Sequence, residues 1–218
     1  MKYSSEMFQN YIFSGHLVID IVNKNLDSNN TIWIFFSQVR KPTNGINELT
    51  VKIKEMNFRF VDVGGQRIER QKWIHCLDNI QVIIFMVSMS EYDLLCDENN
   101  RENKMNESLA LFKLILSNEW FELCSHILFL NKKDIFKEKI MNSSSNLIDY
   151  FPEYDGPAQD VKAAKKFILQ KFISQNQDEE KAIYYHYTCA TDTDNIRYVF
   201  AVVEDTILMS NLLKYNMY

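Results

Sequence analysis

Residues 56–66 read MNFRFVDVGGQ and end in the motif Asp62-Val63-Gly64-Gly65-Gln66. Polar and apolar residues alternate over 51–62, which predicts one or two half-buried strands. An aspartate at the end of a strand can hold a magnesium ion through water, and Gly65, which has no Cβ, lets its backbone N–H approach a terminal phosphate. Gln66 could then orient an attacking water molecule. The same residues would also form a plain glycine turn, so this motif alone leaves both interpretations open.

Two further motifs follow strand-like apolar runs downstream. Asn131-Lys132-Lys133-Asp134 ends the run HILFLN at 126–131. In such a motif the Asp carboxylate accepts two donors from a guanine edge, the Lys stem covers the base, and the Asn ties neighbouring loops together. Thr188-Cys189-Ala190-Thr191 ends the β-prone run 182–188, and an amide such as that of Ala190 can donate to the guanine O6. Each motif alone also suits an ordinary turn, but the three in this order indicate a guanine-nucleotide fold.

The rest of the chain alternates between strand and helix patterns. The continuous apolar run 81–88 is typical of a strand covered on both faces. Residues 105–117, 158–174 and a last segment after Thr191 carry apolar side chains at three- to four-residue spacing, which predicts amphipathic helices. We therefore expect an α/β fold with a mostly parallel sheet flanked by helices.

The composition excludes several classes of protein. A formal net charge of −5 argues against a general nucleic-acid binder. The four cysteines are widely spaced and form no CxxC pair, which favours reduced thiols over a metal or disulfide framework. No apolar run has the length of a transmembrane segment, and the start of the chain does not read as a signal peptide. Position 2 is Lys rather than Gly, so the chain has no N-myristoylation site.

An upstream segment makes a family resemblance specific. Arg40-Lys41-Pro42-Thr43-Asn44-Gly45-Ile46 has the pattern R-x-x-T-x-G-I ahead of DVGGQ. With it, the chain resembles the alpha subunits of heterotrimeric G proteins over residues 39–218. Small GTPases of the ribosylation-factor group also carry DVGGQ and NKxD motifs, but Trp73-Ile74-His75-Cys76 and the sequence TCATDT at 188–193 favour the trimeric family.

The resemblance implies a fold, ligands and an activity. The fold would be that of the P-loop hydrolases, in the Ras-like form, and the ligands would be GTP or GDP with Mg²⁺. Arg40 would be an arginine finger supplied in cis, Thr43 and Asp62 would hold the metal, and Gln66 would position the water for GTP hydrolysis; a solvated loop position is the alternative for Arg40. The implied nucleotide-binding residues are Arg40, Thr43, Asp62, Gly64, Gly65, Gln66, Asn131, Lys132, Asp134, Cys189, Ala190 and Thr191.

The resemblance also implies partner proteins. Residues 67–76 are similar to the family's second switch, where Lys72 and Trp73 would contact the beta-gamma dimer. A core position is the alternative for Trp73.

The C-terminal tail resembles the receptor-contacting end of the family's last helix. There Leu213, Tyr215 and Met217 would fill a groove of a seven-helix receptor. The resemblance thus implies a cytoplasmic signal transducer, held by its partners at the inner face of the plasma membrane, that passes a G-protein-coupled receptor signal to effector proteins.

The phosphate-binding loop of this family is missing from the sequence. A P-loop needs two glycines five residues apart followed by Lys and Ser or Thr, and none of the five glycines of the chain fits. We also expect the family's helical domain to be absent, because only 39 residues precede Arg40. We expect a divergent segment at 1–38 and a truncated Ras-like GTPase domain at 39–218. Since a P-loop follows a central strand, we hypothesise that 31–36, or else 16–22, supplies a substitute strand.

Two functions stay open on the sequence. The first is a magnesium-dependent GTPase switch of the alpha-subunit type. The second is a non-catalytic pseudo-GTPase module, or a truncated gene product, that keeps the receptor and beta-gamma surfaces without turning over nucleotide. The missing P-loop puts GTP hydrolysis in doubt, so the sequence does not decide between them.

Overall fold

The computed structural model describes residues 21–22, 29–37, 45–53, 56–64, 70–71, 73, 80–96, 102–142, 145–178, 180–189, 201 and 205. Its strands are β1 (Ile21–Val22), β2 (Asn29–Ser37), β3 (Ile46–Ile53), β4 (Met56–Val63), β5 (Ile80–Ser88), β6 (Ser125–Asn131) and β7 (Ile183–Tyr187). Its helices are α2 (Lys104–Leu116), α3 (Lys133–Met141), α4 (Leu147–Tyr150) and α5 (Val161–Ile173), with short 3-10 turns η2 (Met89–Glu91) and η3 (Glu119–Phe121).

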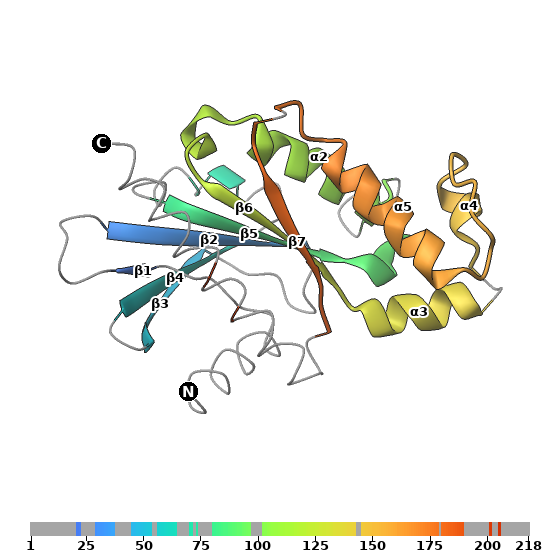
Figure 1. Ribbon diagram of the computed structural model, residues 1–218, viewed down its shortest axis with the longest axis horizontal. Helices are drawn as coiled ribbons and strands as arrows, with labels where there is room; N and C mark the ends of the chain where they lie inside the picture. Colours follow the sequence, from blue (N-terminus) through green and yellow to red (C-terminus); the bar gives the residue numbers. More distant parts are fainter. Residues whose placement is uncertain are drawn as a thin grey trace.

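The strands form one mixed sheet in the order β3-β4-β1-β2-β5-β6-β7 (Figure 1). β2 pairs in parallel with β4 and with β5, and the parallel pairing continues through β6 to β7. β3 is antiparallel to β4, and the short β1 is antiparallel to both β2 and β4. The expected mostly parallel sheet flanked by helices is confirmed.

β2 fills the central place of the sheet. Its residue Ile34 lies level with Asp62 of β4 and with Ile84 of β5. The hypothesis that 31–36 supplies a substitute strand is therefore confirmed. In the other candidate segment, 16–22, residues 21 and 22 are described, and they form β1. The inner edges of β4 and β5 both find hydrogen-bonding partners in β2, so neither leaves its backbone groups orphaned.

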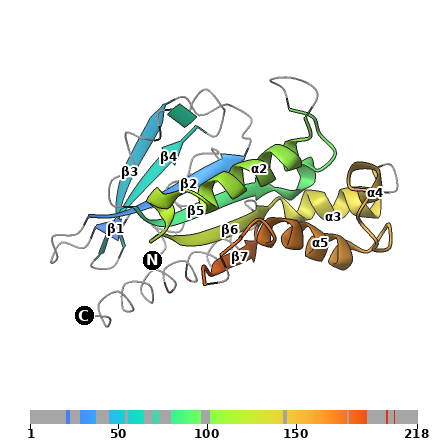
Figure 2. The same ribbon diagram turned by 90° about the horizontal axis from the view of Figure 1, so that it is seen from above.

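Helices α2 and α5 pack on the same face of β5. The rings of Phe85 in β5, Phe112 in α2 and Phe172 in α5 lie with centroids 4.9 to 6.5 Å apart, and all three are buried. Figure 2 shows α2, α3 and α5 from above, with α3 and α5 side by side. Every residue of β5 from Val82 on is buried, as its continuous apolar run predicts.

The helix starts follow local side-chain chemistry. The Asn103 carboxamide accepts hydrogen bonds from the backbone N–H groups of Met105 and Asn106 at the start of α2. Asp160 caps α5 in the same way. Both are preferred N-cap residues because their oxygens satisfy N–H groups that have no partner within the helix. The predicted last helix lies outside the described residues except for Ala201 and Asp205, which are helical.

Candidate nucleotide-binding site

The carboxyl ends of the parallel strands bring residues of all three sequence motifs to one edge of the sheet. Asp62 is the penultimate residue of β4, and its side chain is 1% exposed. Asn131 is the last residue of β6 and lies level with Ser88 at the end of β5. Cys189, which follows β7 closely, is buried at the same edge. Ligands of open α/β sheets bind at this edge, so the motifs are placed as a nucleotide site requires.

Asn131 joins the loop after β6 to the loop after β7. The Thr188 hydroxyl donates to Asn131 Oδ1 at 3.1 Å, which is the loop-tying role that the sequence suggested for this asparagine. Two backbone bonds reinforce the link: the N–H of Thr188 donates to the carbonyl of Leu130, and the N–H of Lys133 donates to the carbonyl of Thr188. The two segments that would face a base are thus held in a fixed relation.

Lys132 begins α3 in the left-handed region of backbone space, with φ 57° and ψ 39°. A non-glycine residue pays roughly 1–2 kcal/mol for this conformation, and such residues cluster at functional sites. Its ammonium donates to Glu91 Oε1 at 2.8 Å, so the stem is held between α3 and η2. The strained turn allows α3 to start directly after the strand.

Asp134 lies in the first turn of α3 with its side chain exposed. A carboxylate is favoured there because the N–H groups of a helix start carry partial positive charge. An exposed carboxylate beside the Asn131–Thr188 link can accept the two N–H donors of a guanine edge. The base-reading role of Asp134 stays a prediction.

The family model described as G-protein alpha subunit matches residues 20–207. The chain belongs to this family. Its α/β sheet is the Ras-like fold of G-protein alpha subunits, and membership implies guanine-nucleotide binding and a role in signal transduction. Family membership also implies interaction with beta-gamma, receptor and effector proteins in general terms. The match begins at residue 20, inside the segment 1–38 that we set apart, and the division at residue 38 stays a prediction.

Trp73 takes the core position that the sequence left open as the alternative to a surface contact. Its side chain is 8% exposed, and its indole Nε1 donates to the carbonyl of Gly64 at 3.0 Å. This bond ties the segment that resembles the G-alpha second switch to the end of β4. A contact between Trp73 and a partner would require the indole to leave this position, so its partner role stays a prediction.

Several predicted site residues lie outside the described part of the G-alpha chain, and their roles stay predictions: Arg40, Thr43, Gly65, Gln66, Lys72, Ala190, Thr191, Leu213, Tyr215 and Met217.

The described residues offer one candidate ligand for magnesium, the carboxylate of Asp62. These residues contain no cluster of three or more His, Cys, Asp or Glu side chains that would hold a metal ion alone. The Asp62 carboxylate is an oxygen ligand of the hard type that magnesium prefers, and this metal commonly takes one or two carboxylates together with substrate phosphates. A single acidic ligand therefore fits a nucleotide-bound magnesium better than an all-protein site.

Sequence reasoning missed Glu91 and Thr188 as members of the site. Glu91 follows the end of β5 by three residues and receives the Lys132 ammonium. Its signal was available, because a charged residue directly after a buried parallel strand lies at the ligand-binding edge. Thr188 was noted only as the start of its motif, although its hydroxyl makes the link to Asn131.

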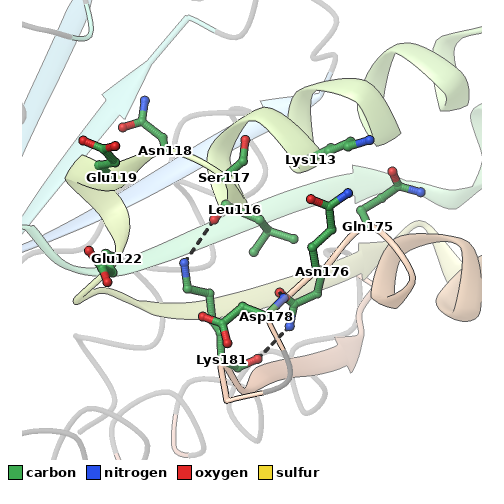
Figure 3. Close-up of a pocket in the computed structure, with 11 residues that line it drawn as sticks. Lys113, Leu116, Ser117, Asn118, Glu119, Glu122, Gln175, Asn176, Asp178 and Lys181 are labelled. Atoms are coloured by element: carbon green, nitrogen blue, oxygen red, sulfur yellow. Dashed lines mark hydrogen bonds between the residues drawn. The ribbon is translucent and has the colours of Figure 1, made fainter.

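A pocket of about 480 Å³ lies at the opposite end of the sheet (Figure 3). It is lined by residues at the C-terminal ends of α2 and α5 and by Lys181 just ahead of β7. The Lys181 ammonium donates to the carbonyl of Leu116, and Asn176 donates to the carbonyl of Lys181. None of the motif residues lines it, so it is distinct from the nucleotide edge.

No helix in the described part of the chain combines the length and the apolar character needed to cross a bilayer.

Proposed function

We propose that this G-alpha chain is a signalling subunit that binds GDP and GTP at the carboxyl edge of β2, β4 and β6. The observation that supports this most directly is the Asn131–Thr188 hydrogen bond, which fixes the base-reading loops beside the exposed Asp134. In this role the chain would couple a seven-helix receptor to effectors together with a beta-gamma dimer. The proposed receptor contacts are Leu213, Tyr215 and Met217. The proposed beta-gamma contacts are Lys72 and, once its indole leaves the carbonyl of Gly64, Trp73.

Chain connectivity supports a place for the catalytic residues at the same edge. Arg40 follows Ser37, the end of β2, by three residues, and Thr43 precedes Ile46, the start of β3, by three. Three residues span at most about 11 Å. Because Ile46 pairs with Val63, directly after Asp62, this spacing supports the proposal that both residues act near the Asp62 carboxylate.

From that edge the residues would act as follows on bound GTP. Asp62 and Thr43 would hold magnesium, which neutralises phosphate charge. Arg40 would stabilise the charge on the transferred phosphoryl oxygens, and Gln66 would orient the water that attacks them. The products would be GDP and phosphate.

The connection after β2 favours a second candidate function. Residues 38–45 read QVRKPTNG and lie in the sequence between the central strand and β3. A P-loop would stand at this place in the fold, and the segment contains neither its glycine pair nor its Gly-Lys-Ser/Thr ending. A binding module that recognises partners without turning over nucleotide is therefore the alternative to a GTPase.

A binding and turnover experiment separates the two. The chain would be titrated by equilibrium dialysis with GDP, a non-hydrolysable GTP analogue and an ATP analogue, in the presence of magnesium. Because the P-loop contacts are lost, we expect saturable guanine binding with a dissociation constant above about 1 µM and weaker binding of the ATP analogue. No guanine binding by a chain with a folded circular dichroism spectrum would support the module instead.

Turnover is tested on the same sample. Single-turnover GTP hydrolysis that is lost in Gln66→Leu, with GDP affinity unchanged, would support the GTPase. Equal rates in the two chains would argue against the proposed role of Gln66. Nanomolar GTP affinity would contradict the expectation that a missing P-loop weakens binding.

A further inference from the structure

Five lysines gather on α3 and α5, beside the carboxyl end of β7. They are Lys133, Lys137, Lys162, Lys165 and Lys166. The two helices lie side by side (Figures 1 and 2). The Lys165 ammonium sits 5.4 Å from the ring centroid of Tyr187, and the Tyr187 hydroxyl donates to the carbonyl of Lys165. We refer to these five side chains as the lysine surface.

The lysine surface has no acidic partners within the described part of the chain. None of its five ammonium groups makes an ion pair with a described residue. Neighbouring lysines do: the pairs are Lys132–Glu91, Lys139–Asp93 and Lys171–Glu153. The contrast shows that acids are available in this region but do not neutralise the five.

The arrangement works against the stability of the helices that carry it. Lys133 and Lys137 are four residues apart on α3, and Lys162 and Lys166 are four apart on α5. Like charges at this spacing repel. Burial, together with the charges of Lys133 and Lys137, also lowers the pKa of Lys165. An external anion would relieve this repulsion.

We propose that the lysine surface binds the anionic headgroups of a lipid membrane. Clusters of four to eight basic residues on a helix are typical of contact with acidic lipids. All five cations are lysines, which act as point charges in a diffuse field, whereas specific phosphate recognition favours the arginine fork. Lysine is also depleted at protein–protein interfaces, which favours a membrane over an acidic protein.

An exposed tyrosine borders the lysine surface and suits the same partner. Tyr185 is 45% exposed, and its ring centroid lies 6.2 Å from that of Tyr187. Tyrosine has an apolar body and a polar tip, so it is favoured where apolar and aqueous regions meet at a membrane. The five lysines would face the lipid headgroups, and the Tyr185 ring would lie at the edge of the membrane contact.

The proposal does not depend on the proposed nucleotide function. Membrane contact through α3 and α5 needs no bound nucleotide, so vesicle binding and nucleotide binding can each fail alone. Because α3 starts directly after Asn131 and Lys132, a membrane at this surface would lie next to the candidate nucleotide site.

Vesicle sedimentation of the full chain tests the proposal. Partition onto phosphatidylcholine vesicles containing about three-tenths phosphatidylserine would be compared with partition onto pure phosphatidylcholine, at low and at high salt. The test variant is Lys137→Gln/Lys166→Gln, which leaves the Lys165–Tyr187 contact in place. The matched control is Lys113→Glu on α2; each change lowers the formal net charge of −5 by two.

We expect binding only to the acidic vesicles, weakened by high salt. The double variant should bind roughly 10- to 30-fold less tightly, and the control should stay within about twofold of the original chain. Circular dichroism would establish that both variants fold. The proposal is overturned if the chain does not bind acidic vesicles, if the control loses as much binding as the double variant, or if the lysines mediate binding to an acidic protein and not to vesicles.

Discussion

Arg70 Nη2 lies 2.5 Å from Glu107 Oε1, and this ion pair joins the segment after the DVGGQ motif to helix α2. The two side chains are 22% and 17% exposed, so the pair is largely shielded from water. Together with the bond from Trp73 to Gly64, it ties two described residues of the segment that resembles a nucleotide-sensing switch to α2 and to the end of β4. Loss of this ion pair is therefore expected to accompany a rearrangement of the segment.

Glu107→Gln is expected to loosen the Arg70 segment. Removing the carboxylate partner of a partly buried guanidinium costs about 1–3 kcal/mol. We expect this loss to lower the free energy of local opening of residues 65–79. Hydrogen exchange followed by mass spectrometry should show faster exchange in peptides from this segment and little change in β6. Glu119→Gln, in η3 at the other end of α2, is a charge-matched control. Equal exchange in the two variants would mean that the ion pair does not hold the segment.

Thr188→Val tests the link between the base-reading loops. Valine keeps the shape of threonine but lacks the hydroxyl that donates to Asn131 Oδ1. Because Thr188 is buried, we expect a loss of about 1–2 kcal/mol in the free energy of unfolding and weaker binding of GDP. Urea titration and equilibrium dialysis measure the two effects. Thr188→Ser keeps the hydroxyl and should retain GDP binding; a Val variant that binds as well as Ser would show that the link is dispensable.

The sequence predicted most of the elements that carry the site. The apolar runs located β5, β6 and β7, and the alternation over 51–62 became the antiparallel pair of β3 and β4. β2 was placed by a different argument, since the fold needs a strand between β4 and β5 and 31–36 was the preferred candidate for it. Alternation and run length suffice for these strands because both are properties of consecutive residues.

Other features depend on contacts between distant residues, which a pattern does not record. Trp73 suits both a surface and a core, and only packing decides that it is buried. The left-handed turn at Lys132 is imposed by its neighbours, because lysine has no preference for it. The Arg70–Glu107 pair joins residues 37 apart. Such features arise from the assembled fold.

His126 should make the protein less stable in mild acid. Burial, reinforced by the charge of Lys181 and opposed by a nearby Cys124 backbone group, lowers the pKa of this histidine to about 4. The ring is 1% exposed, and neither nitrogen has a hydrogen-bond partner in the structure. The folded pKa thus lies below the unfolded value near 6.5, so the unfolded chain binds more protons as the pH falls from 6.5 towards 4, and stability is lost over that range.

Urea unfolding measures this loss. Between pH 7.5 and 5.5 His126 should account for about 1 kcal/mol of lost unfolding free energy, rising to about 3 kcal/mol near pH 4. His126→Leu should remove this part of the pH dependence. His186→Gln is the comparison, because burial also lowers the pKa of His186, although this side chain is only partly buried. A Leu variant with the original pH profile would show that His126 does not titrate as described.

Asp134→Asn should change which purine nucleotide the chain binds. The carboxylate accepts from the two N–H donors of guanine, whereas an amide accepts one hydrogen bond and donates another. Xanthine presents an N–H donor beside a carbonyl oxygen in the same place, so it matches the amide. We expect GDP binding to weaken by about 1.5–3 kcal/mol, which is about 10- to 100-fold, and XDP binding to strengthen. Competition dialysis with GDP and XDP measures the change in the two affinities.

The control for this change is Asp149→Asn on α4, which removes an equal charge from an exposed site away from the motif. It should leave both affinities unchanged. A loss of GDP binding without any gain for XDP would place the effect of Asp134 in folding rather than in base recognition. A reciprocal exchange, in contrast, would show that the Asp134 carboxylate reads the purine edge, because only a direct contact responds to both the side chain and the base.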